Sequence, residues 1–153
     1  MTKIDERTPV PRIDAAARAR LREALDCDGV VSAYLFGSQA TGRTGPLSDI
    51  DLAIYVDPRA SADHRDAIQI LLANRAAEAL DSGEIDVVLL NEAPPLLRHR
   101  SIKDGILLVE RDPVARVRLE TEGLLYYLDT SPLRATLAEG RRRRIAEGSF
   151  GRR

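Results

Sequence analysis

The chain has 153 residues, a net charge of −1, 44% hydrophobic residues and 31% charged residues. This length is sufficient for one domain with its own core, and the balance of residue types excludes a disordered chain. The near-neutral charge excludes a chain that binds nucleic acid through its overall charge, so nucleic acid is not expected as a direct partner.

Cysteine content and hydropathy indicate the compartment in which the protein functions. The single cysteine, Cys27, excludes an internal disulfide and a cysteine-rich zinc site. The N-terminal segment lacks the apolar region of a signal peptide, and no stretch approaches the roughly 20 apolar residues of a membrane span. We therefore expect a cytoplasmic protein with no membrane partner.

The first half of the chain predicts two strands between two helices. An extended lead-in over residues 1–12 precedes a helix that Asp14 caps and that runs to about Asp26. The pattern then predicts a strand over Val30–Phe36, a short helical turn over Ser38–Thr41, a loop over Gly42–Pro46, a strand over Asp49–Val56 and a helix over Ser61–Leu80.

The second half alternates two further strands with helices. It predicts a strand over Glu84–Leu90, a short helix from Pro94 to about Ile102, a strand over Ile106–Val109, a helix from Asp112 and a final helix from Ser131. In the helix from Asp112 we expect an inward apolar side made of Val114, Val117, Leu124, Leu125 and Leu128.

The order αββαβαβαα predicts an α/β (α+β) fold, with a small mixed β-sheet flanked by helices. We expect the domain to span residues 13–138. The remaining residues, 139–153, form a basic segment that we expect to be flexible, with fraying after Gly140.

Two acids, Asp49 and Asp51, flank Ile50 at the start of the second predicted strand. Side chains two residues apart in a strand share a face, so both acids project together, away from the buried face that carries Ile50. Neighbouring carboxylates repel unless a cation lies between them, and hard oxygen ligands suit Mg²⁺. If the third strand pairs beside the second, Asp86 completes three carboxylates, with Glu84 as the alternative on the same strand face.

The dipeptide Gly37-Ser38 follows the first predicted strand and supplies the other half of a candidate site. Glycine permits a tight turn and the close approach of a ligand, and backbone amides at the start of a helical turn can bind phosphate. The loop could therefore hold a triphosphate while the following strand holds the metal, as in two-metal phosphoryl-transfer sites.

The arrangement Gly37-Ser38, ten residues, then Asp49-Ile50-Asp51 resembles the GSx10DxD signature of the DNA polymerase β-like nucleotidyltransferase superfamily. Asp86 resembles the third carboxylate of that superfamily. The short length, the stretch from Ile106 to Asp112 and the helix with Tyr126-Tyr127-Leu128-Asp129 are similar to minimal nucleotidyltransferases, in particular the MntA-type antitoxins of HEPN/MNT toxin–antitoxin systems. The resemblance covers roughly residues 14–135 and implies the polymerase β-like palm fold.

The resemblance implies an adenylyltransferase that uses ATP and two Mg²⁺ ions. Asp49 and Asp51 would hold both metals, Asp86 would complete the shell of the catalytic metal, and Gly37 and Ser38 would hold the β- and γ-phosphates. The implied reaction transfers AMP to a tyrosine of a partner, a HepT-type toxin of the HEPN class, and thereby silences its RNase activity.

Two other functions stay open at this point: an antitoxin that neutralises by binding without chemistry, and a small-molecule nucleotidyltransferase of the aminoglycoside type. About 45 residues follow the last predicted strand, which is enough for two helices and favours a protein acceptor over an enclosed drug pocket. Gln39 and Thr41 stand where family members often carry arginine, and we expect weaker or altered nucleotide contact there. The modified residue, the nucleotide preference, the number of AMP units and the stoichiometry of a complex stay undetermined.

Overall fold

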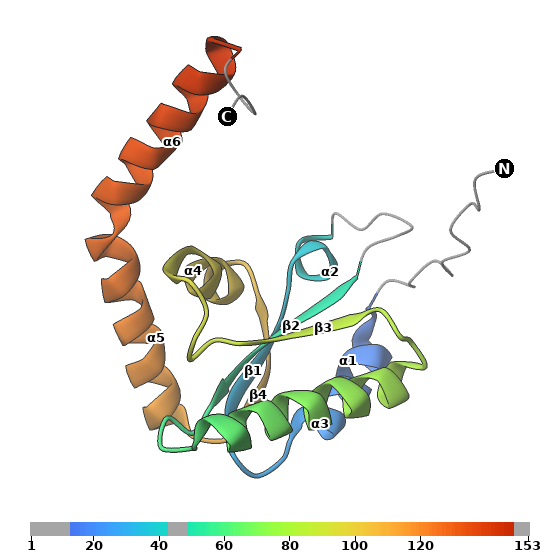
Figure 1. The fold of residues 1–153 in the computed structure, drawn as a ribbon. Coiled ribbons are helices and arrows are strands. Elements are labelled where there is room, and N and C mark those ends of the chain that lie inside the picture. The colour runs from blue at the N-terminus through green and yellow to red at the C-terminus, as the bar shows by residue number, and fades with distance from the viewer. Residues whose placement is uncertain (1–12, 43–48, 149–153) are drawn as a thin grey trace, which may run out of the picture.

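The computed structural model describes residues 13–42 and 49–148. A four-stranded mixed sheet forms the centre, and helices pack on both of its faces (Figure 1). The predicted fold class is therefore confirmed. The predicted lead-in over residues 1–12, most of the predicted loop over Gly42–Pro46 and the last five residues of the chain lie outside the described residues.

The sheet contains β1 (Val30–Phe36), β2 (Ile50–Val56), β3 (Ile85–Leu89) and β4 (Ile106–Glu110), in the order β3-β2-β1-β4. β1 is antiparallel to β2 and β4, whereas β3 runs parallel to β2. A parallel pair needs a crossover connection, which the helix between β2 and β3 provides. The single helical turn α2 (Ser38–Thr41) follows β1. All four strands agree with the predicted bounds to within one residue.

The helices α1 (Ala15–Leu25) and α3 (Ala62–Leu80) cover one face of the sheet. Each buries one apolar side that repeats at helical spacing, Ala17, Leu21 and Leu25 on α1 and Ile68, Leu72 and Ala76 on α3. The carboxylate of Asp14 caps α1 by accepting a hydrogen bond from the Ala17 amide at 2.7 Å. The side chains of Ile50, Leu52 and Ile54 on β2 face these helices.

The opposite face of the sheet packs against α4 (Pro95–Lys103) and α5 (Pro113–Asp129). Leu119 of α5 lies against Tyr55 of β2, whose hydroxyl donates to the Leu119 carbonyl at 3.4 Å. Gly123 permits this close packing, because a Cβ at that position would lie only 3.2 Å from the Tyr55 hydroxyl and from the Arg98 Nε. The lack of a side chain at Gly123 therefore lets α5 lie close to the sheet.

The prediction that the large aliphatic residues of α5 point inward is wrong. Val114 is 82% exposed, Val117 53%, Leu124 44%, Leu125 57% and Leu128 54%, whereas the buried residues of the helix are Leu119 and Gly123. The helix carries apolar residues on two sides, and the side with the smaller residues fits against α4 and the sheet. Hydrophobic periodicity alone could not distinguish between the two sides.

The last helix, α6 (Ser131–Ala146), continues from the end of α5 and extends away from the sheet (Figure 1). None of its residues is buried. The helix includes Arg141–Arg144 and ends at Ala146, and the expected flexibility of residues 139–153 stays a prediction. None of the described helices is both long and apolar enough to cross a membrane.

Candidate active site

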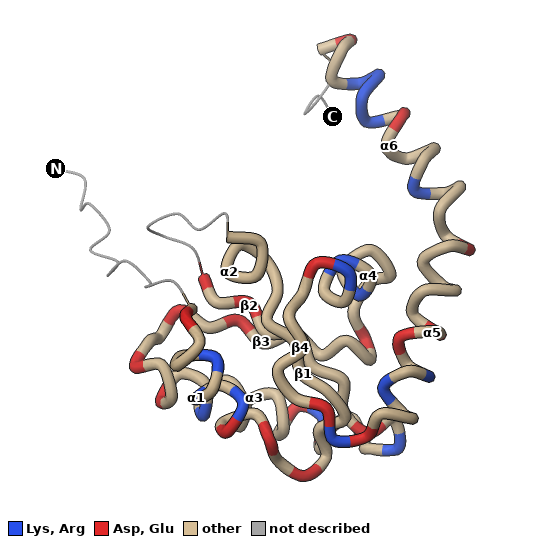
Figure 2. Tube along the Cα trace, turned by 180° about the vertical axis from the view of Figure 1, so that it is seen from behind, with Lys and Arg blue, Asp and Glu red and all other residues tan. Residues whose placement is uncertain are grey.

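The structure places Asp51 and Asp86 side by side on neighbouring strands. Asp51 is the second residue of β2 and is the register partner of Asp86 in the parallel β2–β3 pair. Register partners in a sheet project from the same face, so the two carboxylates share a face. Asp49 comes two residues earlier, just before β2 begins. Figure 2 shows the acidic segments of β2 and β3 next to each other near α2.

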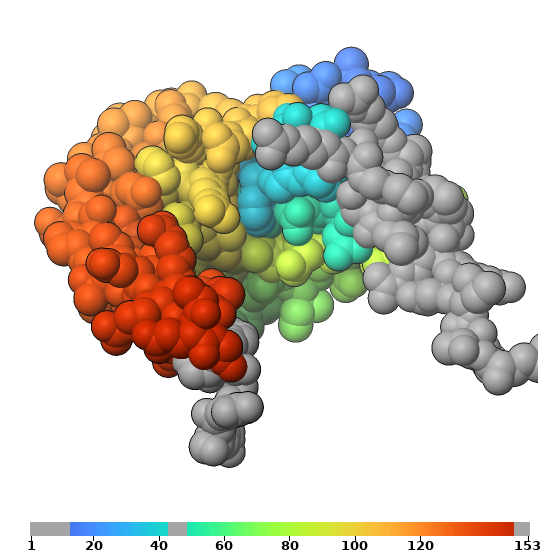
Figure 3. Space-filling model, turned by 90° about the horizontal axis from the view of Figure 1, so that it is seen from above, coloured from blue at the N-terminus to red at the C-terminus, as the bar shows by residue number. Residues whose placement is uncertain are grey.

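These acids lie at an uncovered end of an otherwise buried face. Ile50 and Leu52 are buried against α1 and α3, so Asp51 projects from the face that α4 and α5 cover farther along β2. Asp51 itself is half-buried, and Asp86 is exposed. Figure 3 looks onto this end of the sheet and shows α2 and β2 at the surface beside α4. An external molecule can therefore reach the carboxylates.

The environment of Asp51 disfavours its charged form. Burial raises the pKa of the Asp51 carboxyl above its ordinary value, and the negative charges of Asp86 and Asp49 raise it further. Such crowding of like charges is unfavourable in the free protein and is relieved by a bound cation. The negative charge that the three acids concentrate here therefore favours the binding of a cation.

Gly37 lies directly against the Asp51 carboxylate. Its backbone has φ +70° and ψ −150°, a combination that is essentially restricted to glycine, and it forms the start of α2. A Cβ built on Gly37 would overlap the carboxylate of Asp51. Ser38, the other predicted loop residue, is the first residue of α2 and is partly buried. The two halves of the sequence motif are therefore in contact.

The two departures from the family pattern are held by the protein's own backbone. Gln39 is only 5% exposed, and its side-chain oxygen accepts a hydrogen bond from the Ile13 amide at 3.2 Å. The Thr41 hydroxyl donates to the Gly37 carbonyl at 3.2 Å. Gln39 thus contributes to the packing behind α2, a role that the sequence did not indicate. Altered nucleotide contact at these positions stays a prediction.

The oxygen-only donor set of the three acids is the chemistry that Mg²⁺ prefers, and the ion typically uses one or two carboxylates together with substrate phosphates and water. Within residues 13–42 and 49–148, no group of three or more His, Cys, Asp or Glu side chains is arranged to hold a metal ion by itself. The Asp51–Asp86 pair fits a magnesium site that substrate phosphates complete, and the three-carboxylate shell stays a prediction.

A partly buried polar network that the sequence did not single out connects the sheet to α5. The Tyr34 hydroxyl on β1 donates to the Glu120 carboxylate, and Arg116 donates to the same carboxylate at 2.9 Å and to Glu110. Burial, followed by the hydrogen bond to Glu120, raises the pKa of Tyr34 far above its usual range. The hydroxyl therefore stays protonated and positions α5 beside the sheet.

Comparison with solved structures gives the same fold. A chain from a crystal structure of a toxin–antitoxin with AMP-PNP matches with a TM-score of 0.54 and 23% identity, covering 86% of this chain and 98% of that chain. A chain from the tri-AMPylated Shewanella oneidensis HEPN toxin in complex with MNT antitoxin gives a TM-score of 0.61 and 21% identity, covering 81% and 94%. A chain from a toxin–antitoxin MntA-HepT structure matches with a TM-score of 0.52 and 21% identity, covering 89% of this chain and 99% of that chain.

No curated protein sequence matches the chain. The family model described as polymerase beta, nucleotidyltransferase matches residues 21–114, which is more than half of the chain. The match contains Gly37, Ser38 and all three acids, and it extends from α1 through β4 to the start of α5. The family match covers more than half of the chain, and the fold and the contact between Gly37 and Asp51 are consistent with it. The chain therefore belongs to the polymerase beta nucleotidyltransferase family.

Proposed function

We propose that this chain is a Mg²⁺-dependent protein adenylyltransferase that transfers AMP from ATP to a tyrosine of a HEPN-type toxin and neutralises that toxin as its antitoxin. The observation that carries the proposal is the register pairing of Asp51 with Asp86 beside the Gly37 turn, within a nucleotidyltransferase domain. Carboxylates and a phosphate-binding turn in contact are what nucleotidyl transfer requires.

Each residue has a defined part in the proposed reaction. Asp49, Asp51 and Asp86 hold Mg²⁺, and Gly37 and Ser38 hold the β- and γ-phosphates of ATP. Bound Mg²⁺ supplies positive charge that offsets the charge of the triphosphate. The acceptor hydroxyl attacks the α-phosphorus, a new P–O bond forms, the bond to the β-phosphate oxygen breaks and pyrophosphate leaves. Asp86, which is more exposed than Asp51, accepts the hydroxyl proton.

Two observations favour a protein acceptor over a small molecule. The carboxylates lie at an open end of the sheet, where Asp86 is exposed, so a side chain presented by another protein can reach them. The solved structures with the same fold include a tri-AMPylated HEPN toxin in complex with MNT antitoxin. Larger cavities that would enclose a small substrate usually bury most of its surface, unlike this open edge.

The test incubates the purified chain with ATP labelled at the α-phosphate, Mg²⁺ and a candidate partner, a HEPN-type protein from the same organism. We expect label on a tyrosine of that protein and loss of its RNase activity. Asp51→Asn should abolish labelling, whereas Asp66→Asn, at an exposed position on α3, should not change it. Neutralisation without label would instead support an antitoxin that acts by binding, and label on an aminoglycoside alone would support a small-molecule enzyme.

A further inference from the structure

One side of α5 carries a row of exposed residues at regular spacing. We call the row the α5 stripe, and it consists of Val114, Val117, Thr121, Leu124 and Leu128. The intervals alternate between three and four residues, which is the spacing of the contact positions in a helix–helix seam. Every member is exposed, and the four apolar members are between 44% and 82% exposed.

None of the residues of the α5 stripe is buried against the described part of the domain. Leu119 and Gly123, on another side of the same helix, already make the contact with the sheet. A surface helix needs only one apolar side to bury against its own core. A second apolar side that runs most of the length of the helix indicates a contact with another molecule, since exposed apolar rows of this kind mark protein interaction sites.

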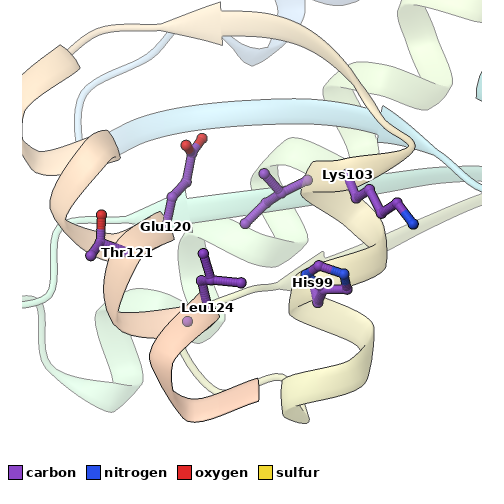
Figure 4. Close-up of a pocket in the computed structure, with 7 residues that line it drawn as sticks. His99, Lys103, Glu120, Thr121 and Leu124 are labelled. Carbon is purple, nitrogen blue, oxygen red and sulfur yellow. The ribbon is translucent and has the colours of Figure 1, made fainter. Parts of the chain in front are cut away.

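A small cavity opens at the edge of the α5 stripe. Its volume is about 280 Å³, and it lies between α4 and α5, with Thr121 and Leu124 of the stripe among its lining residues (Figure 4). His99 and Lys103 line it from the α4 side. A helix laid on the stripe could insert one large apolar side chain here, as a knob enters a hole in helix packing.

The adjoining helix α6 adds a charged part, where Leu137, Arg141 and Arg142 line a hollow of about 660 Å³ together with Leu96 of α4 and Tyr127 of α5. It contains five arginines, Arg134 and Arg141–Arg144, and one glutamate, Glu139, while Leu133 and Leu137 are each 61% exposed. Figure 2 shows the basic run near the end of this helix, away from the sheet. Isolated helices of this length are only marginally stable in water, so a helix with no buried residue gains most from packing on a partner.

We propose that the α5 stripe and α6 together form the docking surface for a helix of the acceptor protein, apolar where it meets α5 and acidic where it meets α6. The inference rests on the proposed function in one respect, namely that the docked protein is the one that receives AMP. A second copy of this chain that met α6 with its own α6 is a poorer occupant, because five arginines on each helix would face one another with Glu139 as the one acid on each.

The test compares binding of full-length variants to the HEPN-type protein by calorimetry. Val117→Glu combined with Leu128→Glu should weaken binding about tenfold or more, since charged groups replace apolar contacts at the centre of the surface. Ile70→Glu is the matched control, because Ile70 is 64% exposed on α3, and it should bind like the wild type. Melting temperatures should agree among all variants, since the substituted positions are exposed.

A second pair of variants tests the charged part. Arg141→Glu combined with Arg142→Glu should weaken binding at low salt, and the loss should shrink as salt rises. Wild-type binding by both pairs of variants would overturn the proposal. So would a wild-type chain that is dimeric alone and becomes monomeric on Val117→Glu and Leu128→Glu, because the occupant would then be a second copy.

Failure of docking and failure of the proposed function give different results. If the stripe variants bind and transfer AMP as the wild type does, the docking surface is wrong and the adenylyltransferase stands. If the wild type binds through the stripe and Mg²⁺ with ATP yields no labelled tyrosine, the docking surface stands and the adenylyltransferase is wrong.

Discussion

The carboxylate of Asp51 fills the space that a side chain on residue 37 would need. Glycine at position 37 and aspartate at position 51 come from the ends of antiparallel neighbours, since Phe36 and Asp51 are register partners. The turn after β1 and the acid on β2 are thereby held in contact across the sheet. The glycine and the second acid of the GSx10DxD motif therefore also depend on each other for packing.

Gly37→Ala should destabilise the protein by about 1–3 kcal/mol, because alanine does not tolerate the Gly37 backbone angles and its Cβ would displace Asp51. Transfer activity should also fall, since the carboxylate would move. Gly83→Ala is the control, because Gly83 has no positive φ and no atom within 4 Å of the added Cβ. Urea unfolding of both variants measures the difference, and equal stabilities would contradict the steric account.

Asp51→Asn should change how stability depends on pH. The pKa of Asp51 is higher in the folded protein than the ordinary value of 3.8. The folded state of the wild type is therefore most stable while this carboxyl is protonated, and it loses stability as pH rises from 3.8 through the folded-state pKa. The asparagine variant has no proton to lose, so its stability should fall less over the same window. Thermal unfolding from pH 3 to pH 7 in the absence of Mg²⁺ tests this, and parallel curves would contradict it.

Mg²⁺ together with a non-hydrolysable ATP analogue should stabilise the wild type. Ligand at ten times its dissociation constant adds about 1.4 kcal/mol to the free energy of unfolding. EDTA should reverse the gain, and Asp51→Asn and Asp86→Asn should each reduce it, because both carboxylates are proposed to hold the ion. Differential scanning calorimetry measures the effect. If a variant with both substitutions gained as much stability as the wild type, these two residues would be excluded as ligands.

Tyr34→Phe should destabilise the protein by about 1.5–3 kcal/mol, because the charged Glu120 carboxylate would lose the hydrogen bond that the Tyr34 hydroxyl donates to it in a partly buried site. Tyr126→Phe is the control, since Tyr126 lies on α5, as Glu120 does, and its side chain is exposed. Denaturant unfolding compares the two variants. A neutral Tyr34→Phe would mean that Arg116 alone satisfies Glu120.

Much of this fold could be predicted from the chain because its signals are local. Apolar residues recur at helical spacing in α1 and α3, and capping residues such as Asp14 mark where helices begin. The alternation of Asp51 with Ile50 and Leu52 correctly indicated that the acid leaves the α1/α3 core. The third strand does pair beside the second, which was the condition for Asp86 to join the other acids, and the pairing places Asp86 next to Asp51.

The sequence by itself therefore determined the elements, the alternation on β2 and the spacing of glycine and acids, because each depends on residues that are close in the chain. Only the tertiary structure decided which side of α5 is buried. Both sides are apolar, and close packing at Gly123 against Tyr55 selects between them. The contact between Gly37 and Asp51 likewise required the pairing of β1 with β2, since no local pattern specifies how closely two distant segments approach.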